Sequence, residues 1–193
     1  TTTNPPKYGN YYLIPVLTSN KVVSARRNSE SEDNPIGVEY INGQPRQRWA
    51  ITRITSNNVW KNPNDIEYYI SEGSRFKAMS IYHDENTRGN RILATMSFNT
   101  LSRNIPQIWT IDPINDGTFS IKTVRPSYNQ TLKSGFLAIN TARKDDNSTT
   151  DYFEQLMIGQ VLNTGFDIPD SNTIPTNTER FYLYNLDFGN AYK

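Results

Sequence analysis

Few side chains in this sequence have the chemistry and the spacing of a catalytic or metal-binding group. The 193 residues include one histidine and no cysteine. This composition excludes disulfides, thiolate nucleophiles and nearly all histidine-based triads and metal sites. The histidine, His83, lies in the polar segment 81–86, where we expect a solvated imidazole. The sequence contains no Gly-rich phosphate-binding motif and no Gly-x-Ser-x-Gly motif.

The closely spaced acidic residues also lack the setting of a catalytic pair. They form three groups, which are Asp84 and Glu85; Glu30, Glu32 and Asp33; and Asp145 and Asp146. Each group lies among Ser and Asn residues, a composition typical of solvated loops rather than of acid–base catalysts. Asp145 and Asp146 precede Asn147 and offer oxygen ligands for calcium, but no EF-hand spacing follows. We therefore expect a protein that is not an enzyme and that needs no metal or other cofactor.

The overall charge argues against nucleic acid as a partner. Basic and acidic residues number 20 and 19, so the formal net charge is +1, whereas nucleic acids and anionic membranes attract concentrated positive charge. No apolar run approaches the roughly 20 residues that a transmembrane helix needs, and we expect a soluble protein. The lack of cysteine fits either the cytosol or secretion without disulfides. The compartment, and with it any use of the sequons at Asn129 and Asn147, stays open.

Short apolar runs rich in Tyr, Val, Ile and Phe predict an all-β chain. Asn, Ser, Gly, Pro and Asp separate the runs, as is typical of strands joined by turns. The 12 Tyr, 8 Phe and 3 Trp residues supply enough aromatic rings for a core. We expect about twelve strands in a single domain over residues 1–193. They cover residues 11–16, 21–25, 36–41, 49–54, 67–71, 76–81, 91–98, 109–112, 118–124, 136–139, 155–162 and 181–186.

An internal repeat predicts how these strands are arranged. The pattern Gln-x-Trp-x-Ile occurs at residues 47–51 and again 60 positions later at 107–111, and a degraded copy follows at 179–183. Each copy closes a unit of four predicted strands, and the units span about residues 8–56, 66–114 and 115–188. Such units bury their apolar faces only against one another.

Three units of four strands predict a β-trefoil. In this fold, six strands close a barrel and three hairpins cover one of its ends. A large ring at the end of each unit can fill the space where the three units meet. We therefore expect Trp49, Trp109 and Phe181 to pack in the core rather than to bind a ligand.

The Gln-x-Trp repeats resemble those of the ricin-B-type carbohydrate-binding trefoils over essentially the whole chain. The resemblance implies a sugar site in each unit, made of a second-strand Asp, a stacking aromatic ring, an Asn and the motif Gln. Here the matching second-strand positions hold Ser24, Ser80 and either Ala138 or Asn140. A serine cannot replace a bidentate carboxylate at equal strength. The candidates for a non-standard sugar site are Tyr40, Asn42, Phe98 and Asn99.

The sequence is also similar to the fungal mycocypin-type protease inhibitors (clitocypin and macrocypin). The similar segments are 34–39, 48–51, 108–113, 116–121 and 180–183, and residues 166–178 match a long Pro-rich third unit. The resemblance implies that the loops after the first and third strands block the cleft of papain-like proteases. The corresponding positions are Thr18, Ser19, Asn20, Asn42, Gly43, Gln44 and Pro45. We favour Gly43 because a small residue approaches a narrow cleft without a side-chain clash.

A third loop of the mycocypins holds the residue that engages legumain or trypsin in some members. The matching residues 72–75 include Gly73 and Arg75 but no Asn. The lack of Asn argues against legumain as the target, and Arg75 is compatible with a trypsin-like protease. All three loops are also compatible with ordinary hairpin turns. The sequence therefore predicts a recognition or defence protein. A target protease is the leading hypothesis for its partner, and a glycan is the alternative.

Overall fold

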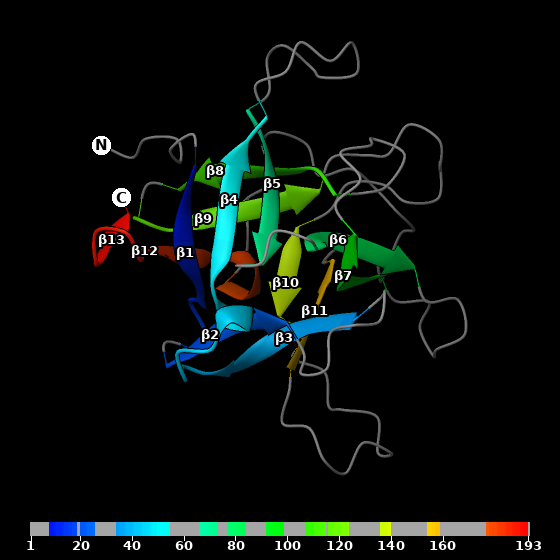
Figure 1. The fold of residues 1–193 in the computed structure, drawn as a ribbon, viewed down its shortest axis with the longest axis horizontal. Coiled ribbons are helices and arrows are strands. Elements are labelled where there is room, and N and C mark those ends of the chain that lie inside the picture. The colour runs from blue at the N-terminus through cyan, green and yellow to red at the C-terminus, as the bar shows by residue number, and fades with distance from the viewer. Residues whose placement is uncertain are drawn as a thin grey trace.

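The computed structural model describes residues 8–18, 20–25, 34–54, 66–72, 77–83, 92–98, 107–114, 116–123, 136–139, 154–158 and 177–192. These residues form β-strands and two short 3-10 helices, so the predicted all-β class is confirmed (Figure 1). The first four strands are β1 (Tyr8–Pro15), β2 (Lys21–Ala25), β3 (Asn34–Tyr40) and β4 (Trp49–Arg53). The next four are β5 (Glu67–Glu72), β6 (Lys77–His83), β7 (Ile92–Phe98) and β8 (Trp109–Pro113). The last five are β9 (Phe119–Thr123), β10 (Leu137–Ile139), β11 (Glu154–Ile158), β12 (Phe181–Asn185) and β13 (Asn190–Tyr192).

Six of these strands close a barrel. β1 pairs with β4, β4 with β5, β5 with β8, β8 with β9, β9 with β12, and β12 again with β1. All six pairings are antiparallel. Each strand thus has a ring neighbour on both sides, although β9 and β12 pair only at Phe119 and Phe181.

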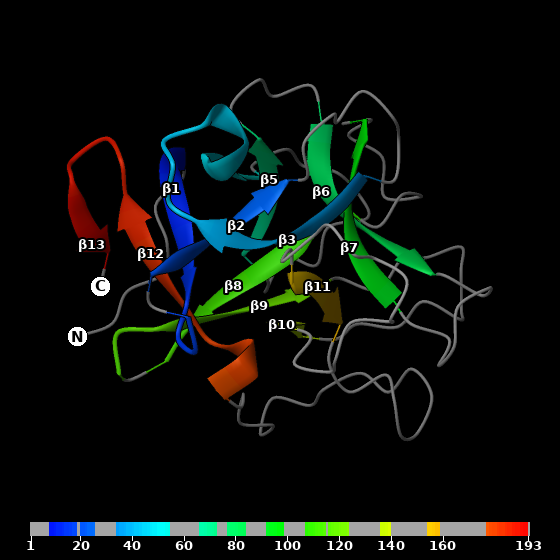
Figure 2. The same cartoon turned by 90° about the horizontal axis from the view of Figure 1, so that it is seen from below.

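Three hairpins form a second closed ring below the barrel. They are β2–β3, β6–β7 and β10–β11. Their neighbouring strands pair as β3 with β7, β7 with β11, and β11 with β3. Figure 2 looks onto β2 and β3, which lie across the lower part of Figure 1. A six-stranded barrel with a ring of three hairpins is a β-trefoil, as the sequence predicted.

The predicted count of twelve strands is not confirmed. The described residues form thirteen strands, because the chain turns back after β12 and adds β13 to the edge of that strand. The turn contains Gly189 with a φ of +68°, a conformation that glycine adopts at little cost. A three-residue strand has too short a pattern for period-2 alternation to reveal it.

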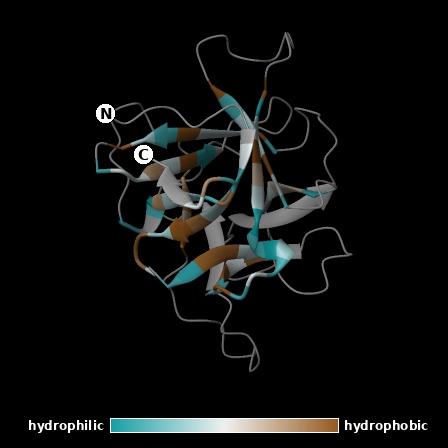
Figure 3. Cartoon of the chain, turned by 60° about the vertical axis from the view of Figure 1, so that its left-hand side comes forward, coloured by the Kyte–Doolittle hydropathy of each residue, from teal (hydrophilic) through white to brown (hydrophobic). Residues whose placement is uncertain are grey.

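The large rings of the repeats lie in the core, as predicted. Trp49, Trp109 and Phe181 are fully buried in one hydrophobic cluster. The indole Nε1 of Trp49 donates to the carbonyl oxygen of Val23 at 2.9 Å, and that of Trp109 donates to Met79 at 2.9 Å. Each tryptophan thus ties the fourth strand of its unit to the second strand. Figure 3 shows hydrophobic residues interspersed with hydrophilic ones along the strands, as the alternation of inward and outward side chains requires.

An ion pair joins the turn between β8 and β9 to the start of β12. The Asp116 carboxylate accepts hydrogen bonds from the hydroxyl and the backbone N–H of Thr118, and it pairs with Arg180 Nη1 at 3.0 Å. The Thr118 hydroxyl contributes most to holding the pKa of Asp116 below its usual value. Burial has the second-largest effect and raises the pKa, whereas the Thr118 N–H and the Arg180 charge each lower it by a smaller amount.

We predict that Asp116 makes the stability of the fold depend on acidity. Because its pKa is lower in the folded than in the unfolded chain, ionised Asp116 stabilises the fold above its ordinary pKa of 3.8. This contribution is lost as the pH falls through the folded pKa. Asp116→Asn should lower the Tm at pH 6, and its deficit relative to the wild type should shrink towards pH 2. Thermal unfolding followed by circular dichroism from pH 2 to 7 measures this, with Asp112→Asn as the control. A deficit that is the same at every pH would contradict the assignment.

Candidate functional site

The hairpin β2–β3 presents different side chains on its two faces. Lys21 pairs with Tyr40, Val23 with Val38, and Ser24 with Gly37. The side chains of Val23 and Val38 belong to the core cluster. Because side chains alternate along a strand, Ser24 and Glu39 lie on the opposite face of the hairpin, away from that core. They make the polar contacts described next.

The segment after β3 is held by the motif glutamine. Gln47 ends the 3-10 helix η1 (Pro45–Gln47) and is fully buried. Its Oε1 accepts from the backbone N–H of Asn42 at 2.9 Å. Its Nε2 donates to the carbonyl oxygen of Tyr40 at 2.8 Å and to Glu39 Oε1 at 3.1 Å. Both hydrogens of the Gln47 amide are therefore used within the protein, so this residue stabilises the loop and has no N–H left for a ligand.

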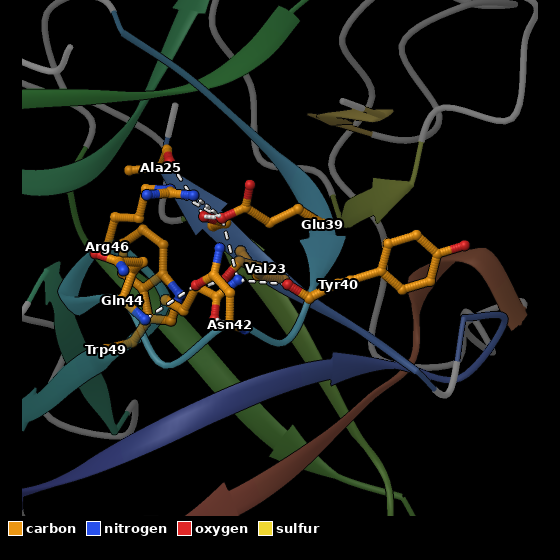
Figure 4. Close-up of polar contacts among 10 residues, drawn as sticks. Val23, Ala25, Glu39, Tyr40, Asn42, Gln44, Arg46 and Trp49 are labelled. Atoms are coloured by element: carbon orange, nitrogen blue, oxygen red, sulfur yellow. Dashed lines mark hydrogen bonds and ion pairs between the residues drawn. The ribbon is translucent and has the colours of Figure 1, made fainter. Parts of the chain in front are cut away.

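Four polar contacts converge on one oxygen of Glu39 (Figure 4). Oε1 accepts from Ser24 Oγ at 2.7 Å, from Arg46 Nε at 2.8 Å and from Gln47 Nε2 at 3.1 Å. Arg46 Nη2 lies 2.8 Å from the same oxygen. Among the described residues, Oε2 makes no hydrogen bond or ion pair. The side chain of Glu39 is 25% exposed, so solvent or a ligand can reach it.

The second strand of this unit contains no carboxylate, but Glu39 of the third strand places one beside it. Its contact with Ser24 places the charge beside the residue that matches the sugar-binding Asp of the ricin-B-type trefoils. Sequence reasoning missed both Glu39 and its partner Arg46. The signal that could have revealed them is the pairing register, since Ser24 opposite Gly37 makes Glu39 its diagonal neighbour on the same face.

The predicted residue Tyr40 lies apart from this polar cluster. It follows Glu39 directly in β3, so its side chain leaves the strand on the other face. Its ring is 64% exposed and points away from the contacts of Glu39 (Figure 4). Lys21 Nζ lies 5.2 Å from the ring centroid, within the range of a cation–π interaction. The backbones of Tyr40 and Asn42 thus both bond to Gln47, whereas the Tyr40 ring lies away from Glu39.

The two loops predicted to contact a protease emerge at the same end of the hairpin. Thr18 and Asn20 lie just before Lys21, and residues 42–45 follow Tyr40, its strand partner. The first loop is a turn in which Lys21 N donates to Thr18 O at 2.9 Å. In the second loop, Gln44 N donates to Asn42 Oδ1 at 3.0 Å, while Gly43 is exposed with a φ of +75°. Pro45 is exposed at the start of η1.

Several predicted residues lie outside the part of the chain that the structure describes. Ser19, Gly73, Arg75 and Asn99 are among them, and Phe98 is described only as the last backbone position of β7. Within the described ranges, no three His, Asp or Glu residues gather into a group that could hold a metal ion. None of the helices described there is long and apolar enough to cross a membrane.

Solved structures share this arrangement of strands. The Rhizoctonia solani agglutinin superposes with a TM-score of 0.57 at 13% identity, over 96% of this chain and 99% of the agglutinin. ThreeFoil, a designed protein with threefold symmetry, superposes with a TM-score of 0.55 at 16% identity, over 92% of this chain and 99% of its own. The chain has the β-trefoil fold.

Part of a mosquitocidal holotoxin also superposes on this fold. It matches 95% of this chain with a TM-score of 0.57 at 16% identity, but the chain spans only 17% of the holotoxin's length. At such identities, the similarity shows the fold alone. No protein-family model and no curated protein matches the sequence.

We predict that Glu39 and Arg46 stabilise the fold jointly. Glu39→Ala removes the only described side-chain acceptor of Arg46, which is 15% exposed, and one acceptor of the buried Gln47. It should cost about 2 kcal/mol of the free energy of unfolding, and Arg46→Ala about 1 kcal/mol. The double variant should cost about 1 kcal/mol less than the sum of the two.

Urea unfolding of the four proteins measures this coupling. Arg48→Ala is the matched control, because Arg48 is the exposed neighbour of Gln47 and its loss should change stability by less than about 0.5 kcal/mol. Strictly additive effects of the two single variants would contradict a direct interaction.

Proposed function

We propose that this protein is a non-enzymatic carbohydrate-binding protein with a sugar site around Glu39 in its first repeat. The observation that carries the proposal is the asymmetric carboxylate of Glu39. Oε1 is held by Ser24, Arg46 and Gln47, whereas Oε2 has no partner among the described residues. A fixed carboxylate with one open oxygen suits a sugar hydroxyl, because hydrogen bonds to a charged acceptor are stronger than neutral ones.

Two residues near Glu39 keep hydrogen-bond donors that the described residues do not use. Asn42 is exposed, and its side-chain oxygen accepts from Gln44 N, so its amide nitrogen faces no described partner. Arg46 uses Nε and Nη2 on Glu39 and has further N–H groups at Nη1. One hydroxyl of a sugar can donate to Glu39 Oε2 while its neighbour accepts from Asn42 or Arg46. The loop is already ordered by Gln47, so little conformational entropy is lost on binding.

The similarity to solved structures supports this proposal over the protease hypothesis that the sequence favoured. One of the matching structures is an agglutinin, and the carboxylate that the second strand lacks is supplied from β3. The exposed Tyr40 ring lies on the other face of the hairpin, so it does not form part of the proposed site around Glu39.

We predict that glycan binding depends on the charge of Glu39. Wild-type protein on a glycan array should bind a subset of neutral glycans, and Glu39→Gln should weaken that binding at least about tenfold, as expected for loss of a charged hydrogen bond. Asp112→Asn, which removes an exposed carboxylate on β8, is the matched control and should bind normally. An array without any bound glycan, or equal binding by Glu39→Gln, would contradict the proposal.

One observation supports a second candidate function, which is protease inhibition. Both predicted inhibitory loops lie at one end of hairpin β2–β3, and the exposed apolar residues Leu17, Tyr40 and Ile41 lie there as well. These side chains are 47%, 64% and 49% exposed. Clustered apolar side chains beside two turns are typical of a surface that enters a protein cleft.

Titration of papain and trypsin tests this second candidate. If the loop of residues 42–45 enters the cleft, Gly43→Trp should weaken inhibition at least about tenfold, because a large side chain then occupies the approach. Gly43→Asn is the matched control, since Asn tolerates the positive φ of this position better than other residues do. Full activity of both proteases in a large molar excess of wild-type protein would contradict inhibition of these classes.

A further inference from the structure

The turn between β12 and β13 contains the most exposed large apolar side chain of the described residues. Phe188 is 81% exposed, compared with 64% for Tyr40. The hairpin lies beyond the twelve strands of the repeat pattern, at the left of Figure 1 and away from β2 and β3. The closure of the barrel therefore does not account for this residue.

Several hydrogen bonds fix the backbone beneath Phe188. Asn185 Oδ1 accepts from the N–H groups of Asp187 at 2.8 Å and of Phe188 at 3.1 Å. Asn185 O accepts from Gly189 N at 2.8 Å, and Tyr184 donates its hydroxyl to Gly189 O at 2.8 Å. These bonds fix the backbone from which the Phe188 side chain extends, so a partner need not order the turn.

Polar groups with unused hydrogen-bonding capacity lie next to this ring. The Asp187 carboxylate accepts from Asn10 N at 3.1 Å through Oδ2 and from Asn10 Nδ2 at 3.2 Å through Oδ1. Each carboxylate oxygen thus keeps a lone pair, and Asp187 is exposed. Among the described residues, the side-chain oxygen and the second amide hydrogen of Asn10 have no partner.

We propose that Asn10, Asp187 and Phe188 form a second saccharide site, separate from the one around Glu39. The ring of Phe188 packs on the C–H face of a sugar. Asp187 accepts from its hydroxyls, and Asn10 donates to them and accepts from them. Apolar surface beside fixed acceptors and donors matches the two sides of a sugar ring. The site does not need Glu39, so it can exist whether or not the first site binds.

The surroundings favour a saccharide over a membrane or a protein. Residues 8–18 and 181–192 contain Asp187 and no Lys or Arg, so this surface does not attract anionic lipid. A stable protein interface buries about 800 Å² on each partner. The exposed Leu17 follows the end of β1 opposite Asn10, and Tyr40 and Ile41 lie at the end of β3. None of them extends a single exposed ring to that size.

Two substitutions of Phe188 test the proposal. Oligosaccharides ending in galactose, glucose, mannose or N-acetylglucosamine are the probes, on an array and in solution. We expect Phe188→Ala to lose at least about tenfold in affinity for some of these glycans, while Phe188→Trp keeps them, because indole also stacks on a sugar face. Measured against the wild type, which contains Trp49, Trp60 and Trp109, the fluorescence of the new indole should shift when sugar is added. Tyr182→Ala, which removes an exposed ring elsewhere on β12, is the control.

The Glu39→Gln variant separates the two proposed sites. Binding that survives in Glu39→Gln and is lost when Phe188→Ala is added supports the second site even if the first one fails. Binding that Glu39→Gln weakens and Phe188→Ala leaves unchanged overturns the second site and leaves the first intact. Absence of glycan binding by the wild type overturns both. Phe188-dependent binding to phosphatidylcholine vesicles, without glycan binding, also overturns this proposal.

Discussion

No repeat of this chain can bury its apolar face alone, and the rest of the structure depends on how three repeats meet that constraint together. Six strands close the barrel and three hairpins close the ring below it, so each unit completes the core of the other two. The indole hydrogen bonds of Trp49 and Trp109 add a specific link within each of the first two units. Phe181 has no N–H to make such a link. The third unit therefore relies on packing and on the pairing of β12 with β1 and β9.

This constraint leaves the hairpin ends and the turns free to differ between units. The turns do not contribute to the core, so their side chains can be exchanged without opening either ring of strands. In the first unit, that freedom is used to gather Ser24, Glu39 and Arg46 on the outer face of β2–β3. At the end of the third unit, the chain adds strand β13, and the turn before it exposes Phe188. A scaffold with threefold strand symmetry can thus carry sites that are not symmetric, because the fold specifies the strands and not the chemistry of the loops.

The fold was predictable from the sequence because its signals are local and repeated. A buried glutamine two residues before a buried tryptophan marks the start of a fourth strand, and the pattern recurs 60 residues later. The site was predicted less well, because it depends on the pairing between strands. Glu39 reaches Ser24 only through the register of β2 and β3, in which Ser24 lies opposite Gly37. Tyr40 was assigned to the site by its distance along the chain. Because side chains alternate between the two faces of a strand, Tyr40 points to the face that Glu39 does not occupy.

The motif glutamine illustrates why a family resemblance transfers the fold more safely than the site. In this chain, the Gln47 amide donates one hydrogen to Glu39 and one to Tyr40, and its oxygen accepts from Asn42. The same side chain therefore cannot assist a ligand as the resemblance implied. Its burial stabilises the loop, and this frees the exposed Asn42 and the open oxygen of Glu39 to be the groups that meet solvent. A residue can persist in a repeat for packing and backbone hydrogen bonding alone. The chemistry of a site then has to be established from the atoms that remain unpaired.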